Sequence, residues 1–276
     1  MRNIKPQSIG IVISTYNNPE WLEKTLSGYT LQTHNTFELI LADDGSGEDT
    51  RELIDKFRNK YFPNIKHIWH ADEGFRKCKI LNDAIVASES EYLIFTDHDC
   101  IPRKDFIETH LRYAEKEYFL SGGYPKLPME TSKAITYEDI ISENAFDIKW
   151  LRQHGLKSSF KNTKLLKSKT FASFMNFITP AKASWNGCNS SGWKEDMLAI
   201  NGFNESMQYG GLDREFGERL VNMGIRSKQI RYSAICVHLD HSRPYKNKEL
   251  IERNKEIRRN VKANKIIKTP NGIEKL

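Results

Sequence analysis

Short apolar runs alternate with segments of helical spacing through the first part of the chain, and this alternation constrains the fold most strongly. Residues 8–14 are apolar and mostly β-branched, which predicts a buried strand. Residues 20–31 carry apolar side chains at close to helical spacing, which predicts a helix. Predicted strands at 37–42, 65–69 and 92–95 then alternate with predicted helices at 48–61 and 76–87. Such alternation forms βαβ units, so we expect an α/β fold with a largely parallel sheet flanked by helices.

Acidic residues follow two of these predicted strands. Asp43 and Asp44 come after the strand at 37–42, and Asp97 and Asp99 come after the apolar run that ends at Phe95. Ligands of open α/β sheets bind beyond the carboxyl ends of the strands, so this pattern favours a nucleotide crevice. Asp97 and Asp99 project alike from an extended chain, so a cation, a basic side chain or water must neutralise them. A polar loop after a strand is the alternative interpretation.

Two common nucleotide-binding patterns are absent from the sequence. It contains neither a GxGxxG pattern nor a P-loop, which argues against a dinucleotide dehydrogenase and a P-loop ATPase. Phosphates bound in the crevice would therefore be held by a metal. Pro102, which follows the second acidic pair, is expected to prevent regular strand pairing.

Composition sets further bounds. The 276 residues suffice for one large or two small domains, and 38% hydrophobic residues suffice for a core. No apolar run approaches the ~20 residues of a membrane span, and no signal-peptide core precedes the first strand, so we expect a cytoplasmic protein. The four cysteines lie far apart and are expected to be free buried thiols. A net charge of +6 is compatible with nucleotides, nucleic acid or an anionic membrane face, but no nucleic-acid-binding motif occurs and no nucleic acid is expected.

The N-terminal half resembles family 2 glycosyltransferases of the GT-A fold, a Rossmann-like fold with a mixed, mainly parallel central sheet. The resemblance is carried by Ser14-Thr15-Tyr16-Asn17, Asp43-Asp44-Gly45-Ser46, Phe75-Arg76 with Asn82, and Asp97-His98-Asp99 as the DxD motif. It implies a UDP-sugar donor and the nucleotide-sugar-binding residues Ser14, Tyr16, Asn17, Asp44, Arg76, Asp97 and His98.

The resemblance also implies a role for most of these side chains. Ser14 and Tyr16 line the nucleobase pocket, and Asp44 accepts a hydrogen bond from uracil. Arg76 lies along the base or phosphates, Asp97 faces the ribose, and Asp99 binds the metal. The alternatives are structural: Tyr16 as a turn aromatic, Asp43 as a cap of the next helix, and Arg76 in a surface ion pair.

The sequence pattern indicates the secondary structure least clearly in the middle of the chain. The pattern predicts a helix at 105–117, a strand at 118–124 and helical structure at 137–150. The basic segment at 157–169 is expected to be a solvated loop, with a phosphate-bearing acceptor as the alternative partner.

A second group of motif residues lies further along. Helices are predicted at 193–200 and 212–222, and two glycines precede Asp213 in the first turn of the second helix. The segment resembles the C-terminal portion of β-1,4-galactosyltransferases, whose Trp-Gly-Gly-Glu-Asp pattern appears as Tyr209-Gly210-Gly211-Leu212-Asp213. That resemblance implies that Asp213 is the catalytic base and that Gly210 and Gly211 approach the donor sugar. Tyr209 and Leu212 depart from the pattern, so the identities of donor and acceptor are not carried over. Helix capping is the alternative role of Asp213.

Two histidines follow the last predicted strand. His238 and His241, together with Asp99, supply nitrogen and oxygen ligands that suit manganese, with magnesium as the alternative ion. The galactosyltransferase resemblance places a metal-binding methionine at position 238 and a metal-binding histidine at position 241. Residues 246–268 are strongly basic and are expected to form a solvated helix, with contact to an anionic membrane face as the alternative.

These observations predict one GT-A domain over residues 1–245, with a nucleotide-binding half at 1–102 and an acceptor and catalytic half at 103–245, followed by a basic helical tail at 246–276. The predicted enzyme is a metal-dependent, inverting transferase. It moves a hexose or N-acetylhexosamine from a UDP-sugar to a hydroxyl of a glycan, free or lipid-linked, in bacterial surface polysaccharide or lipopolysaccharide synthesis. The alternatives are a retaining transferase and a non-catalytic glycan- or nucleic-acid-binding protein. The expected location is the cytoplasm, with peripheral contact at the inner membrane face.

Overall fold

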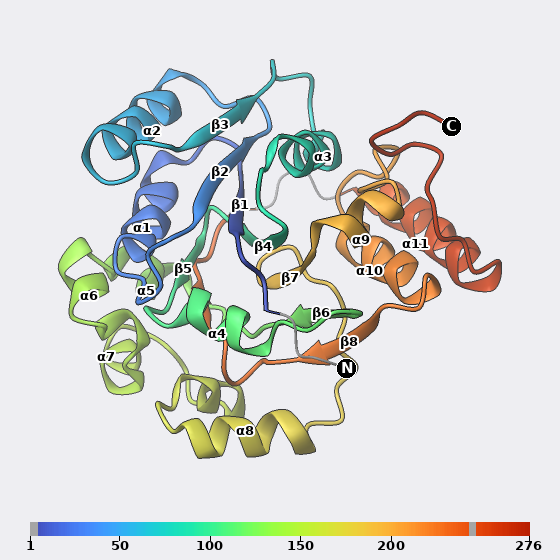
Figure 1. Ribbon diagram of the computed structural model, residues 1–276. Coiled ribbons are helices and arrows are strands. Elements are labelled where there is room, and N and C mark those ends of the chain that lie inside the picture. Colours follow the sequence, from blue (N-terminus) through green and yellow to red (C-terminus); the bar gives the residue numbers. More distant parts are fainter. Residues whose placement is uncertain (1–4, 243–246) are drawn as a thin grey trace.

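The computed structural model describes residues 5–242 and 247–276, and its centre is a seven-stranded sheet. The strand order is β3-β2-β1-β4-β7-β6-β8 (Figure 1). The bounds are β1 Ile9–Thr15, β2 Glu38–Asp43, β3 Lys66–Trp69, β4 Tyr92–Asp97, β6 Tyr118–Ser121, β7 Ser190–Trp193 and β8 Arg226–Gln229. The strands β1 to β4 pair in parallel, as does β6 with β8, while β7 is antiparallel to both of its neighbours. The mixed, mainly parallel α/β sheet that the sequence predicted is thus confirmed.

Helices cover both faces of this sheet (Figure 1). The alternation along β1 assigns the faces: Ile11 and Ile13 pack with residues of α1 and α2, whereas Val12 packs with residues of α3, α9 and α10. The bounds are α1 Pro19–Tyr29, α2 Glu48–Lys60, α3 Lys77–Ala87, α4 Phe106–Tyr113, α5 Met129–Ala134, α6 Tyr137–Ile141, α7 Ile148–Gln153, α8 Lys169–Ile178, α9 Lys194–Ala199, α10 Leu212–Asn222 and α11 Lys248–Ala263. Two short 3-10 helices, η1 Asn144–Phe146 and η2 Phe160–Leu165, lie in the middle segment.

A second, two-stranded sheet joins distant parts of the chain. β5 (Cys100–Pro102) pairs antiparallel with β9 (Cys236–His238), and Cys100 stands opposite His238. The backbone amide of Leu239 donates to the carbonyl of Asp99 at 2.8 Å. The expectation that Pro102 prevents regular pairing was wrong, because β5 is a short edge strand and Pro102 is its last residue.

The middle segment differs from its predicted pattern. The helix expected at 137–150 is broken into α6, η1 and α7, and the loop expected at 157–169 contains η2. Glu143 adopts φ 61° between α6 and η1, a left-handed conformation that interrupts a helix. The segment packs Ile140, Phe146 and Leu151 into a hydrophobic cluster that it shares with residues of α1, β5 and β9.

The predicted C-terminal helix is present as α11, although Lys246 and the expected domain boundary at residue 245 lie outside the described residues. One side of α11 packs against α10, where Arg258 of α11 forms an ion pair with Glu218 at 2.5 Å. The helix expected to be solvated therefore has one face within the fold. None of the described helices is both long and apolar enough to cross a bilayer.

Candidate active site

A cavity of about 1700 Å³ opens at the carboxyl ends of the parallel strands. The strand register explains the convergence, since Ser14 at the end of β1 stands opposite Asp97 at the end of β4. Of the predicted site residues, those lining the cavity are Ser14, Tyr16, Asn17, Asp44, Asp97, His98, Asp99, Gly210, Gly211, Asp213, His238 and His241.

Arg76 is the predicted site residue that does not line the cavity. Its guanidinium pairs with Glu73 at 2.7 Å and donates to the carbonyl of Ala71 at 2.6 Å. Its backbone amide donates to Asp44 at 3.0 Å, so Arg76 helps to position that carboxylate through the main chain.

The first end of the cavity is built around Asp44. The His70 ring nitrogen Nε2 lies 2.8 Å from Asp44 Oδ1, so both carboxylate oxygens have protein partners. Burial raises the pKa of Asp44, against these hydrogen bonds. Tyr16, which is 45% exposed, donates to Asp72 at 2.9 Å and forms the rim. His70 and Asp72 were missed from the sequence, yet both follow β3, whose carboxyl end lies at the same edge of the sheet.

Asp97 and Lys77 form the charged centre of the cavity. Asp97 Oδ1 accepts from Lys77 Nζ and from Ser14 Oγ, both at 2.6 Å. Burial opposes ionisation of Asp97, but the charge of Lys77 and these hydrogen bonds hold its pKa well below the usual value. Burial likewise opposes the charge of Lys77, and Asp97, Asp213 and Asp99 raise its pKa. Lys77 was missed because its acidic partners are distant in the sequence.

Asp99 and the two histidines meet beside this pair. Asp99 Oδ2 lies 3.1 Å from His241 Nε2 and 3.7 Å from His238 Nδ1. The other nitrogen of His241, Nδ1, lies 2.8 Å from the carbonyl of Ser242, and a proton held there leaves the lone pair of Nε2 facing Asp99. His238 Nδ1, the nitrogen that lies near Asp99, is also 2.7 Å from the Leu239 carbonyl. This donor set fits a borderline divalent cation.

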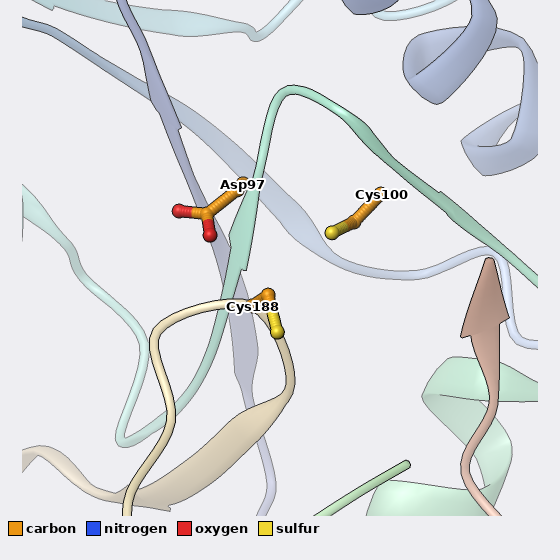
Figure 2. Close-up of side chains that lie close together, drawn as sticks. All are labelled: Asp97, Cys100 and Cys188. Atoms are coloured by element: carbon orange, nitrogen blue, oxygen red, sulfur yellow. The ribbon is translucent and has the colours of Figure 1, made fainter. Parts of the chain in front are cut away.

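Buried cysteines lie close to Asp97, Asp99 and His238. Ligand atoms of Asp97, Cys100 and Cys188 lie within 4.8 Å of one another, as do those of Asp99, Cys100 and His238. Figure 2 shows the side chains of Asp97 and Cys100, which lie on one stretch of chain, near that of Cys188, which lies on another. Burial raises the pKa of both thiols well above the usual value, which disfavours the thiolate that a soft metal requires. The expectation of free, buried cysteines is confirmed.

Asp213 lies in the first turn of α10, after Gly210 and Gly211, which adopt φ 108° and 93°. The N-cap residue of α10 is Gly211, and Asp213 is the second residue of the helix. Its Oδ1 atom is buried without a hydrogen-bond partner. Burial raises the pKa of Asp213 to about 6, against the opposing charge of Lys77. A carboxylate with this pKa can accept a proton near neutral pH.

Gly187 leaves the space that this carboxylate occupies. A Cβ atom at position 187 would lie 2.6 Å from Asp213 Oδ1 and 3.1 Å from its Cγ. Any side chain there would therefore displace the carboxylate.

The glycine loop before α10 is held from two sides. The side chain of Asn254, on α11, donates to the carbonyls of Gln208 and Gly210 at 3.0 and 2.9 Å. Within α10, buried Arg219 pairs with Glu215 at 2.8 Å and donates to two carbonyls of the preceding segment. These contacts fix both the loop and the start of the helix that carries Asp213.

Comparisons with known proteins match the chain to two family models. Residues 10–183 match the model described as glycosyl transferase family 2, and residues 169–242 match one described as the N-terminal domain of galactosyltransferase. Chondroitin synthase of Escherichia coli is 27% identical over 253 residues, which cover 83% of this chain. The chain spans only 34% of the length of that relative.

Solved structures resemble the chain in fold. A mannosyltransferase from Pyrobaculum calidifontis, solved with GDP-Man and Mn²⁺, is 15% identical with a TM-score of 0.57, over 88% of this chain and 59% of that one. TarS residues 1–349 of S. aureus, solved with UDP, is 15% identical with a TM-score of 0.59, over 95% and 70%. At this identity the likeness establishes the fold alone, and together with the family match it confirms the predicted GT-A fold.

Proposed function

Since the chain belongs to family 2 of the glycosyltransferases, we propose that it transfers a hexose or N-acetylhexosamine from a UDP-sugar to a hydroxyl of a glycan acceptor with inversion. The observation that carries the proposal is the placement of Asp213. Asp213 lines the same cavity as Asp97, Asp99 and His241, and one of its carboxylate oxygens, Oδ1, is buried without a hydrogen-bond partner. The proposed general base and the candidate metal site thus belong to the same cavity.

Asp213 is the proposed general base. The acceptor hydroxyl gives its proton to the Asp213 carboxylate while the hydroxyl oxygen attacks the anomeric carbon from the face opposite UDP, and the bond from that carbon to the UDP oxygen breaks. One displacement then inverts the configuration. A pKa of about 6 leaves Asp213 ionised at neutral pH while keeping it more basic than an ordinary aspartate.

Asp99, His241 and His238 are the proposed ligands of Mn²⁺ or Mg²⁺. Such a cation, when bound, neutralises the charge of a diphosphate leaving group. Lys77 contributes a fixed positive charge nearby through its pair with Asp97. The manganese in the mannosyltransferase structure supports this assignment by fold likeness.

The donor nucleotide is proposed to lie along the strand ends. Its proposed contacts are Ser14, Tyr16, Asn17, Asp44, Asp97 and His98, with Gly210 and Gly211 at the sugar, and Arg76 acts on the donor through its main-chain hydrogen bond to Asp44. The UDP in the TarS structure supports a UDP-sugar. The proposed setting is bacterial surface polysaccharide or lipopolysaccharide synthesis in the cytoplasm, with α11 contacting the inner membrane face.

The central test replaces Asp213 by asparagine, which keeps the shape but removes the base. General-base assistance is worth ~10²–10⁴ in rate, so turnover should fall by that factor while UDP still raises the melting temperature. Near-normal turnover would contradict the role of Asp213. NMR of the anomeric product decides the stereochemistry, and a retained configuration would exclude the single displacement.

Metal dependence is tested separately. Asp99→Ala should abolish activity and also abolish the additional stabilisation that Mn²⁺ gives to the UDP complex in a thermal-shift assay. Full activity of the unaltered protein in excess chelator would refute the metal role.

A further inference from the structure

One wall of the cavity carries positive charge that the proposed reaction does not use. It consists of Lys126, Lys157, Lys161, Lys164 and Arg231, all of which line the cavity, and we call it the basic wall. Within the described ranges 5–242 and 247–276, none of these side chains forms an ion pair with a carboxylate.

Among the described residues, three other cations along the same cavity are paired with carboxylates, unlike the residues of the basic wall. Lys77 pairs with Asp97 at 2.6 Å, Arg258 with Glu218 at 2.5 Å, and Lys255 with Glu252 at 2.6 Å. Of the basic wall, Arg231 donates only to the backbone carbonyl of Lys182, at 2.9 Å. A neutral carbonyl leaves its charge uncompensated.

The members of the basic wall also repel one another. Burial lowers the pKa of Lys164, and the charges of Arg231 and Lys161 lower it further. Burial lowers the pKa of Arg231 as well. Partly buried like charges destabilise the folded chain, and an anion placed among them would offset that cost.

All five residues of the basic wall follow β5 in the chain, whereas the proposed nucleotide contacts Ser14, Tyr16 and Asp44 precede it. The sulfur atoms that influence Lys164 belong to Cys236 and Cys188, and Cys188 follows Gly187, the residue beneath Asp213. Lys164 therefore lies in the same cavity as the proposed base, near the segment that carries Gly187.

We propose that the basic wall binds a carboxylate or phosphate group of the acceptor glycan, so that the acceptor is an anionic polysaccharide. This inference rests on the proposed transferase function. The anion would belong to a sugar unit next to the one that receives the new residue, because the attacking hydroxyl itself must lie at Asp213.

The test measures transfer to matched oligosaccharide acceptors, with the donor first identified by hydrolysis of a panel of UDP-sugars. One acceptor carries a uronic acid, one carries a phosphate, and one is uncharged but otherwise the same. At low salt, kcat/KM for a charged acceptor should exceed that for the neutral one at least tenfold, and the advantage should shrink as salt is added. The better of the two charged acceptors identifies the anion.

Variants locate the effect. Lys164→Gln and Arg231→Gln should each raise the acceptor KM about tenfold for the charged substrate but not for the neutral one, and Lys164→Arg should restore the lower KM. Lys169→Gln, an exposed lysine that does not line the cavity, is the matched control. Equal use of neutral and charged acceptors, or equal KM in Lys164→Gln and Lys169→Gln, would overturn the inference. Failure to hydrolyse any nucleotide-sugar would instead overturn the proposed function.

Discussion

Replacement of Gly187 by alanine is the sharpest perturbation of the proposed base. The new Cβ would lie 2.6 Å from Asp213 Oδ1, and ordinary contact begins near 3.4 Å, so the carboxylate must move by about 0.8 Å. Gly187 is not among the glycines with positive φ, so alanine fits the backbone. The cost in stability should be small because the displaced atoms end a side chain, but the cost in catalysis should be large.

A shift near 1 Å of a catalytic group costs about 10²-fold in rate, so Gly187→Ala should lower kcat about 10- to 100-fold. Steady-state transfer assays at saturating donor measure this effect, and UDP thermal shifts establish that the donor site is intact. Gly192→Ala is the matched control, because its Cβ would meet its nearest neighbour at 3.4 Å, in ordinary contact. A kcat of Gly187→Ala within twofold of the control would refute the placement of the base beneath this glycine.

Two further outcomes follow from the buried charges. Because Asp213 has a pKa of about 6 and acts as a carboxylate, activity should fall as the pH drops below 6. The positive charge of Lys77 lowers this pKa, and Lys77→Met removes that charge. The acid limb of the pH–rate profile should therefore move to higher pH in this variant. An unmoved limb would show that Lys77 does not act on the base. Arg219→Met leaves Glu215 buried without its partner and should lower the free energy of unfolding by about 3–5 kcal/mol, measured by denaturant unfolding. Arg226→Met, which breaks an exposed ion pair, should lower it far less. Equal losses in the two variants would contradict the importance of the buried pair.

The sequence predicted those parts of the fold that repeat a simple pattern. Strands β1, β2 and β4 are continuous apolar runs, and the periodicity of α1, α2 and α3 is close to helical. β7 was missed because Ser190-Ser191-Gly192 has low strand propensity. Its position is fixed instead by tertiary contacts: the Ser191 hydroxyl lies 2.8 Å from the Tyr92 hydroxyl and 2.7 Å from His110 Nδ1.

The residues of the candidate site also fall into those that local sequence patterns predicted and those that they did not. Residues that follow strands, such as Asp97 and Asp99, were found because strand ends are visible in a sequence. Lys77 was missed because a lysine at the start of a helix resembles any surface lysine until its acidic neighbours are known. Arg231 of the basic wall was missed for a similar reason. Its position against the cavity depends on the pairing of β9 with β5, which local sequence patterns do not encode.

The pairing of β5 with β9 has a consequence for assembly of the protein. Asp99 precedes β5 and His241 follows β9, so the carboxylate and the imidazole meet only after the late strand has docked on the early one. A chain that has folded its first sheet but not this ladder holds only half of the proposed ion site. High-affinity ion binding would then occur only in the completely folded protein, and a partly folded chain would be unable to use the proposed UDP-sugar donor.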